Sequence, residues 1–333
     1  MLIQAIPPQD RLASVRVLDP ACGSGNFLYV AIQQLLELEK ELILYASRPE
    51  LGTGGLIPRV RPTQLSGIEI NPYAAELAQV VIWIGYLQWM HANGFNAPRN
   101  PILEPITTIE NRDAILKWET PEGEPLSVWE EGAACVGQAD WPEADFIVGN
   151  PPFLGSKQFR VSGLPDEYVE SMYRSFTIAN TSDLVCYWFA IASSVTERRP
   201  KTRTGLLATQ GIRGGGSRSV LDVLVTHATI FDAWSDREWV LDGAAVHVSI
   251  VCFSGDVDSE LIALNGLKVS QIDTRLSAGE SLGSASVLME NQKLGFQGPV
   301  KVGDFDLVLK QARTVFVSPN PHCLLYTSPS PRD

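Results

Sequence analysis

Asn150, Pro151, Pro152 and Phe153 form a polar and aromatic stretch directly after an apolar run that ends at Gly149. The run is bounded by turn residues and predicts a buried strand. Because Pro152 restricts the residue before it to an extended conformation, the Pro151 carbonyl is held beside the Asn150 side-chain oxygen. Two neutral acceptors side by side can take both hydrogens of an NH2 group, and Phe153 offers a flat face to a planar ring. We therefore predict that these four residues are catalytic and act on an amino group of an aromatic heterocycle.

The chemistry that this stretch can support is group transfer to the amino nitrogen. Such an amine is a poor nucleophile because its lone pair is delocalised into the ring. Acceptors placed where the N–H bonds point as the nitrogen becomes tetrahedral stabilise the transition state more than the ground state, and no charged base is needed. The alternative is a turn that only ends the strand, since Asn and Pro are common turn formers.

A second stretch, residues 19–27 (DPACGSGNF), lies between an apolar run and a segment with helical spacing of apolar residues. Gly23 and Gly25 allow the backbone to approach a ligand closely, and the N–H groups at the start of the helix favour polar or anionic groups. Leu28 stands where a dinucleotide fingerprint has its third glycine, so a pyrophosphate is not the expected ligand. Asp19 adds an acceptor for a charged amine, or alternatively only caps the turn.

Two further acidic residues are expected at strand ends. Glu69 falls at the tip of the second expected strand, where an acidic residue usually holds a ribose hydroxyl pair. The alternative is a carboxylate that caps the next helix. Asp113 follows the third expected strand and could accept a hydrogen bond from the adenine of a cofactor. Because ligands bind beyond the carboxyl ends of the strands in open parallel sheets, Asp19, Glu69, Asp113 and Asn150 are predicted to line one crevice.

Apolar runs alternate with helical patterns along the chain, which predicts an α/β fold. We expect a Rossmann-like, seven-stranded, mostly parallel sheet with helices on both faces and an antiparallel last strand. Residues 119–142 and 155–181 are expected to be loops, the second a mobile loop whose Lys157 and Arg160 could touch a phosphate. The expected strands are residues 14–18, 64–70, 105–109, 145–149, 204–209, 229–234 and 244–253.

Composition limits the class of protein. The 333 residues carry five scattered cysteines and four scattered histidines. Without metal-ligand spacing among them, we predict reduced thiols, a cytoplasmic location and no metal site. No signal peptide is apparent. The longest apolar region, residues 74–90, includes polar residues and falls short of a membrane span, so no membrane partner is expected.

The formal net charge of -12 opposes nucleic-acid binding, because Lys and Arg contacts to phosphates supply most nonspecific affinity. An acidic protein can still carry a local basic surface. The alternative for such a run is an ordinary solvated face. The basic residues that are concentrated in one part of the sequence are Arg198, Arg199, Lys201, Arg203, Arg213 and Arg218.

Three regions are expected along the chain. Residues 1–255 would form the catalytic domain. Short alternating segments and a Gly/Ser-rich break then indicate that residues 256–322 begin a C-terminal region. Residues 323–333 have no periodicity that joins them to a core and resemble translated sequencing-adapter read-through, so we expect a non-native tail.

The pair DPACGSGNF (residues 19–27) and GNPPF (residues 149–153), in this order, resembles the S-adenosylmethionine motif and the catalytic motif of gamma-type DNA adenine-N6 methyltransferases. Residues 67–89 and 232–253 are similar to runs in the MmeI-like fusion enzymes of bacterial restriction-modification systems. The resemblance covers roughly residues 15–322. It implies a class I S-adenosylmethionine-dependent methyltransferase that acts on double-stranded DNA after extrusion of the target adenine. Transfer would pass directly from sulfonium to nitrogen, without a covalent enzyme intermediate or a metal.

The resemblance also implies roles for individual residues. Asn150 and the Pro151 carbonyl would bind the target amino group, Phe153 would stack on the extruded base, and Glu69 would hold the cofactor ribose. Asp113 with its neighbour would contact the cofactor adenine. The residues predicted to bind the cofactor are Asp19, Pro20, Ala21, Cys22, Gly23, Gly25, Asn26, Phe27, Glu69, Ile70, Asp113 and Ala114.

The sequence also departs from that family. In the gamma arrangement a further cofactor motif and a helical region precede the first strand, whereas only a short lead does here, and a target-recognition domain should follow. No Asp/Glu-Lys nuclease signature is visible. We therefore expect the catalytic core of a larger enzyme whose full chain adds target recognition and leaves room for a nuclease. Two alternatives stay open: methylation of protein glutamine or RNA guanine, and an inactive cofactor- or DNA-binding fragment.

Overall fold

The computed structural model describes residues 8–46, 58–95, 106–241, 244–258 and 262–278. Contacts divide the chain into two units, Met1–Ser281 and Leu282–Asp333, and the whole second unit lies outside the described residues. The regions predicted at 256–322 and 323–333 therefore fall largely or wholly outside them. The boundary predicted at residue 255 stays a prediction.

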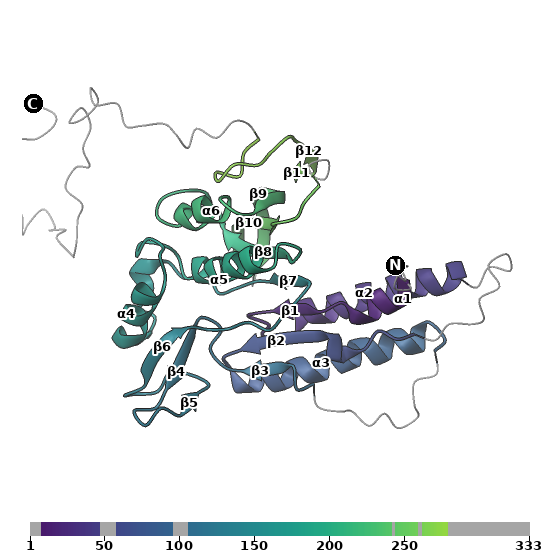
Figure 1. Cartoon of the computed structure of the whole chain (residues 1–333), viewed down its shortest axis with the longest axis horizontal. Helices are drawn as coiled ribbons and strands as arrows, with labels where there is room; N and C mark the ends of the chain where they lie inside the picture. Colours follow the sequence, from purple (N-terminus) through teal and green to yellow (C-terminus); the bar gives the residue numbers. More distant parts are fainter. Residues whose placement is uncertain (1–7, 47–57, 96–105, 242–243, 259–261, 279–333) are drawn as a thin grey trace, which may run out of the picture. The chain divides into compact units, whose positions relative to one another are not determined.

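The described residues form a nine-stranded sheet with the order β12-β11-β9-β10-β8-β7-β1-β2-β3 (Figure 1). The strands from β8 to β3 are parallel neighbours, whereas β10 runs antiparallel to both β8 and β9. The α/β class, the mostly parallel sheet and its antiparallel late strand are thereby confirmed. The strands are β1 Val17–Asp19, β2 Leu65–Glu69, β3 Ile109–Asn111, β7 Phe146–Gly149, β8 Arg203–Thr209, β9 Thr229–Leu241, β10 Ala244–Ser254, β11 Ala263–Leu264 and β12 Leu267–Lys268.

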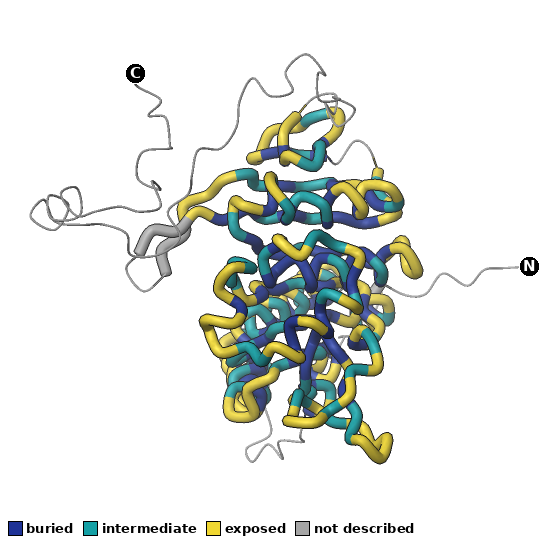
Figure 2. Tube along the Cα trace, turned by 90° about the vertical axis from the view of Figure 1, so that its left-hand side faces the viewer, coloured by how far each residue is buried: buried dark blue, intermediate teal, exposed yellow. Residues whose placement is uncertain are grey.

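Helices pack against both faces of the sheet. Successive residues of a strand point to opposite faces. Val17 joins a core cluster with residues of α2 and α3, whereas Leu18 joins a second cluster with residues of α5 and α6. Figure 2 shows buried residues gathered in the middle of the trace and exposed residues along its outer turns. The helical segments are α1 Pro8–Ser14, α2 Asn26–Ala46, η2 Pro62–Gln64, α3 Pro72–Ala92, η3 Ser156–Gln158, α4 Asp166–Ser175, α5 Val185–Arg198, η4 Gln210–Arg213 and α6 Arg218–Leu224.

The structure corrects the number and limits of the strands. β11 pairs with β9 and carries β12, so two short strands extend the sheet beyond the seven expected. The first strand begins at Val17, where pairing with β2 and β7 begins, and Ser14 belongs to α1. The third begins at Ile109 and not at 105, a position outside the described residues. Propensity locates an apolar run, but hydrogen bonding to neighbours sets its ends.

Both segments expected to be loops contain regular structure. Residues 119–142 contribute to a separate three-stranded sheet of β4 Leu116–Glu119, β5 Pro125–Leu126 and β6 Ala134–Gln138. Residues 155–181 contain α4, whose Tyr168, Val169 and Met172 are buried at helical spacing. Arg160 forms ion pairs with Asp166, the first residue of α4, and with Glu170 one turn further along the helix. Burial of one face of β4 and of one face of α4 stabilises regular structure that the polar sequence did not indicate.

The concentrated basic residues from Arg198 to Arg203 lie at the opposite edge of the sheet from Asn150. Arg203 begins β8, whereas Gly149, next to Asn150, pairs with Leu206 further along that strand. Arg199 is paired with Glu143. These residues therefore do not face the edge where the chemistry was predicted. Among the described helices, none has the length and apolar character that crossing a bilayer requires.

Candidate active site at the carboxyl edge of the sheet

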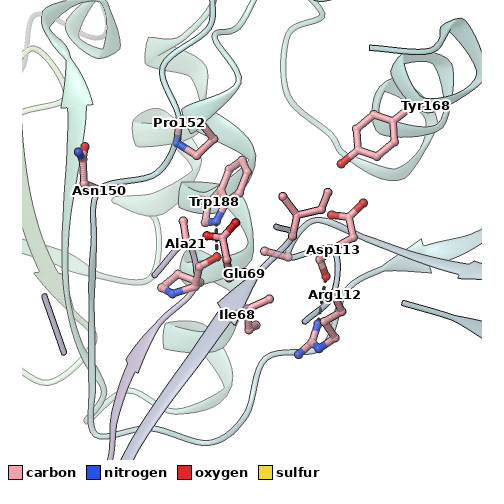
Figure 3. Close-up of a pocket in the computed structure, with 12 residues that line it drawn as sticks. Ala21, Ile68, Glu69, Arg112, Asp113, Asn150, Pro152, Tyr168 and Trp188 are labelled. Carbon is pink, nitrogen blue, oxygen red and sulfur yellow. Dashed lines mark hydrogen bonds between the residues drawn. The ribbon is translucent and has the colours of Figure 1, made fainter. Parts of the chain in front are cut away.

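A cavity of about 300 Å³ lies beyond the carboxyl ends of β1, β2, β3 and β7 (Figure 3). Two predicted residues at or just after the end of each of these four strands line the cavity. Because neighbouring parallel strands end at one edge, residues far apart in the sequence meet there. The structure thus brings together Pro20 and Ala21, Glu69 and Ile70, Asp113 and Ala114, and Asn150 and Pro152.

The turn after β1 depends on glycine. Gly23 and Gly25 have φ values of 52° and 85°, in the left-handed region that side chains disfavour. A Cβ on Gly25 would lie 3.1 Å from Ala78 of α3. Glu69 fixes the same turn, because its Oε2 accepts a hydrogen bond from the Gly23 N–H at 2.8 Å. Its Oε1 accepts from the Asn71 N–H at 2.8 Å, so one carboxylate joins the turn to the end of β2.

Asp19 lies behind the cavity wall, with only 1% of its surface exposed. Its Oδ1 accepts a hydrogen bond from the Ala21 N–H at 3.0 Å. Burial raises the pKa of Asp19 from 3.8 to about 7, the Ala21 N–H opposes this shift, and the charge of Glu69 adds to it. The Asp19 side chain therefore stabilises the turn after β1 through its hydrogen bond to the Ala21 N–H. Its contact with a cofactor amine stays a prediction.

The raised pKa of Asp19 predicts a pH-dependent stability. The folded chain keeps the proton up to about pH 7, whereas the unfolded chain loses it near 3.8. Stability from this group is therefore full below about pH 4 and is lost as the pH rises through 7, by roughly 3–5 kcal/mol. Denaturant unfolding should show wild type losing stability relative to Asp19→Asn between pH 5 and 8. Parallel pH profiles of the two proteins would contradict this expectation.

Gly149 allows the close approach of β7 to Asp19. A Cβ at this position would lie 2.7 Å from the Asp19 Oδ1, closer than side chains tolerate. We expect Gly149→Ala to lower the free energy of unfolding by about 1–3 kcal/mol. Because the added methyl group displaces Asp19, the variant should also bind a ligand less tightly at the turn after β1. Gly155→Ala is the matched control, because its Cβ would meet nothing nearer than the Asp183 Oδ1 at 3.7 Å. Equal melting temperatures for both variants would refute the steric argument.

The predicted catalytic residues differ in their exposure. Asn150 and Pro152 are exposed and line the cavity, whereas Pro151 is buried. Phe153 is half-buried and packs against the core cluster that contains α5. In the part of the chain that the structure describes, the Asn150 side-chain amide makes no hydrogen bond, so its oxygen is available to a ligand. Asn150 is thus exposed at the same cavity that Pro20 and Ala21 of the turn after β1 line.

Several predicted residues do not line the cavity. The buried Cys22 thiol has its pKa raised, first by burial and then by the charges of Asp19 and Glu69. A Cβ on Gly67 would meet its Sγ at 2.8 Å, so Cys22 packs against β2. The predicted residues outside the cavity lining are Asp19, Cys22, Gly23, Gly25, Asn26, Phe27, Pro151 and Phe153.

Four residues that the sequence did not predict complete the lining: Ile68, Arg112, Tyr168 and Trp188. The Trp188 indole N–H donates to the Pro20 carbonyl at 2.9 Å, which joins α5 to the turn after β1. Arg112 donates to the Asp113 carbonyl at 3.2 Å and is paired with Glu110. Trp188 lies in the apolar first half of α5, and no local signal separates it from the core residues beside it.

Comparison with known proteins identifies the family. Residues 6–263 match the family described as MmeI, DNA-methyltransferase domain. The chain belongs to this family. Its match includes the turn after β1, the ends of β2 and β3, and the stretch that follows β7, so every wall of the cavity lies within the MmeI methyltransferase region.

Relatives of this MmeI-family chain are longer proteins. DNA methyltransferase A of Bacillus subtilis (strain 168) is 27% identical over 282 residues, which cover 82% of this chain and 30% of that protein. A putative type II restriction enzyme and methyltransferase of Methanocaldococcus jannaschii is 34% identical over 79 residues, 24% of this chain and 7% of that protein. The chain therefore spans less than a third of either relative.

A solved structure shares the fold of the MmeI-family chain. The Type IIL restriction-modification enzyme MmeI, solved in complex with DNA, superposes with a TM-score of 0.60 at 24% identity. The match covers 82% of this chain and 37% of that one. It supports the α/β methyltransferase fold described above.

Proposed function

We propose that this chain is the catalytic core of a DNA methyltransferase that moves a methyl group from S-adenosylmethionine to the N6 amino group of an extruded adenine. The observation that carries the proposal is a single cavity lined by the end of β7, with Asn150 and Pro152, and by the ends of β1, β2 and β3. A donor held over the first three strands would lie beside an amine held at Asn150.

The cavity residues fit the proposed cofactor. Its volume of about 300 Å³ is at the lower end of the range for small-molecule sites. Glu69 keeps lone pairs beyond its two backbone hydrogen bonds and can accept from ribose hydroxyls. Ile70 is 54% exposed beside the cavity and offers an apolar surface for one face of an adenine ring. S-adenosylmethionine would supply a methyl group on a sulfonium, and Asp113 with Ala114 would lie at its adenine end.

Asn150 and Pro151 would orient the target amine. The Asn150 oxygen and the Pro151 carbonyl would each accept one N–H, and Phe153 would stack on the ring. These acceptors favour the nitrogen as it becomes tetrahedral and positively charged, which raises the rate and not only the affinity. An adenine inside a duplex cannot reach such a site, so double-stranded DNA would have to present an extruded base.

The setting of the activity follows from the family. We propose a role in a bacterial restriction-modification system, with a target-recognition domain outside the catalytic region of residues 1–255. Nucleic-acid affinity would then come largely from that domain, which reconciles the net charge of -12 with a DNA substrate.

The test is nucleoside analysis after reaction with methyl-labelled S-adenosylmethionine. The protein that carries this chain is incubated with duplex DNA, ribosomal RNA or a mixture of proteins, and each product is hydrolysed and separated. We expect the label in N6-methyladenine from duplex DNA. Label in methylcytosine would refute the adenine assignment. Label only in guanine of RNA or in protein glutamine would favour the alternative substrates, and binding without transfer would favour an inactive fragment.

A further inference from the structure

Tyr168 forms a wall of the cavity beside Asp113, although it comes from α4 and is distant in sequence from every predicted residue of the cofactor site. The side chain is 7% exposed and lines the cavity together with Asp113 and Ala114. Its ring packs on Trp118 of β4, with centroids 5.5 Å apart and planes inclined by 29°. The small sheet and α4 therefore hold the phenol in a fixed place.

The Asp113 carboxylate is already engaged by the protein. Its Oδ1 accepts from the backbone N–H groups of Ile115 at 2.8 Å and Leu116 at 3.3 Å. Its Oδ2 accepts from the Trp118 indole N–H at 3.0 Å, and the residue is 3% exposed. An ionised carboxylate offers about four acceptor positions, so one remains. The Tyr168 hydroxyl is directed toward this carboxylate (Figure 3). The Asp113 carboxylate therefore has few lone pairs left to accept a hydrogen bond from a ligand amine.

The Tyr168 phenol can accept a hydrogen bond from a ligand in the cavity. Burial, followed by the facing Asp113 carboxylate, raises the pKa of Tyr168 well above its ordinary value. The phenol therefore keeps its proton in the physiological range. With that proton directed at Asp113, the lone pairs of the phenol oxygen remain available to the cavity. Asn150 and Tyr168 lie on opposite sides of the cavity, with Glu69 and Trp188 between them (Figure 3).

We infer that Tyr168 is a cofactor-binding residue whose phenol oxygen, with its proton turned to Asp113, accepts the amino N–H of the cofactor adenine. Asp113 then acts as a positioning residue that orients Tyr168 and Trp118. The inference rests on the proposed function, because it assigns a group to the adenine end of the proposed cofactor. It also assigns a role to α4, which supplies Tyr168 to the cavity, and to the small sheet, whose Trp118 packs against the Tyr168 ring.

The test compares two cofactors in two variants by calorimetric titration. One ligand is S-adenosylmethionine, and the other is its analogue with hydrogen in place of the adenine amino group. Tyr168→Phe keeps the ring on Trp118 and removes only the hydroxyl. The matched control is Tyr173→Phe, which removes a hydroxyl from the same helix at a residue outside the cavity lining. Melting temperatures are recorded for both variants.

We expect Tyr168→Phe to weaken S-adenosylmethionine binding by about five- to tenfold and to leave binding of the analogue unchanged. Tyr173→Phe should change neither. Equal weakening of the binding of both ligands would show that the Tyr168 hydroxyl acts through the fold. Unchanged binding of both ligands would show that the hydroxyl makes no contact with the cofactor. Either result would overturn this inference and leave the proposed function standing. Failure of the unmodified protein to bind S-adenosylmethionine would overturn the proposed cofactor as well.

Discussion

Replacing Asn150 by alanine should reduce methyl transfer by a factor of about 100–1,000 or more while leaving cofactor affinity nearly unchanged. The expected loss is the size found when one preorganised hydrogen-bonding group is removed from a transition state. Asn150 is exposed at the cavity, so its removal leaves no buried polar group unpaired and should cost little stability. Single-turnover transfer to duplex DNA, together with titration of S-adenosylmethionine, separates the two effects.

Asn93→Ala is the matched control for that experiment. Asn93 ends α3 and donates to the Trp89 carbonyl, away from the cavity lining. We expect full transfer from this variant. An equal loss of transfer and cofactor binding in Asn150→Ala would assign Asn150 to the fold, and retained transfer would remove it from the chemistry.

Glu69→Ala should weaken S-adenosylmethionine binding by about 10- to 100-fold. The substitution removes the acceptor of the Gly23 and Asn71 N–H groups, and with it the proposed acceptor of the ribose hydroxyls. Hydrogen bonds to a charged group contribute about 1.5–3 kcal/mol each, and 1.4 kcal/mol corresponds to a factor of ten. Calorimetric titration measures the change directly.

Two further variants test whether the expected loss of cofactor affinity comes from the oxygen acceptors of Glu69 or from the loss of any carboxylate near the site. Glu69→Gln keeps one oxygen acceptor and should lose less affinity than Glu69→Ala. Glu76→Ala removes an exposed carboxylate from α3 and should bind as the unmodified protein does. If Glu69→Ala lowered the melting temperature without changing affinity, the carboxylate would serve only the turn. The cap of α3 itself is Asn71, whose side chain accepts from the Tyr73 and Ala74 N–H groups, so Glu69 is not the helix-capping carboxylate that the sequence left as an alternative.

Some residues of the site could be predicted from the sequence, and others could not. The residues after β1, β2, β3 and β7 could be placed from the sequence, because each follows an apolar run and parallel strands end at one edge. The same reasoning missed α4, although Tyr168, Val169 and Met172 have helical spacing, because the surrounding polar residues suggest a loop. It also missed the small sheet, whose strands are stabilised by burial of Trp118 against Tyr168.

The sequence by itself determined the α/β class, the four strand ends that form the cavity and the outward position of Asn150, because these depend on short-range patterns of apolar and turn residues. Only the tertiary structure decided which residues close the cavity. Val17 of β1 pairs with Phe146 of β7, and this register sets Gly149 against Asp19 and buries the carboxylate. Trp188 reaches Pro20 and Tyr168 faces Asp113 across long stretches of chain. Contacts of that kind arise from packing between elements, and no spacing within one element records them.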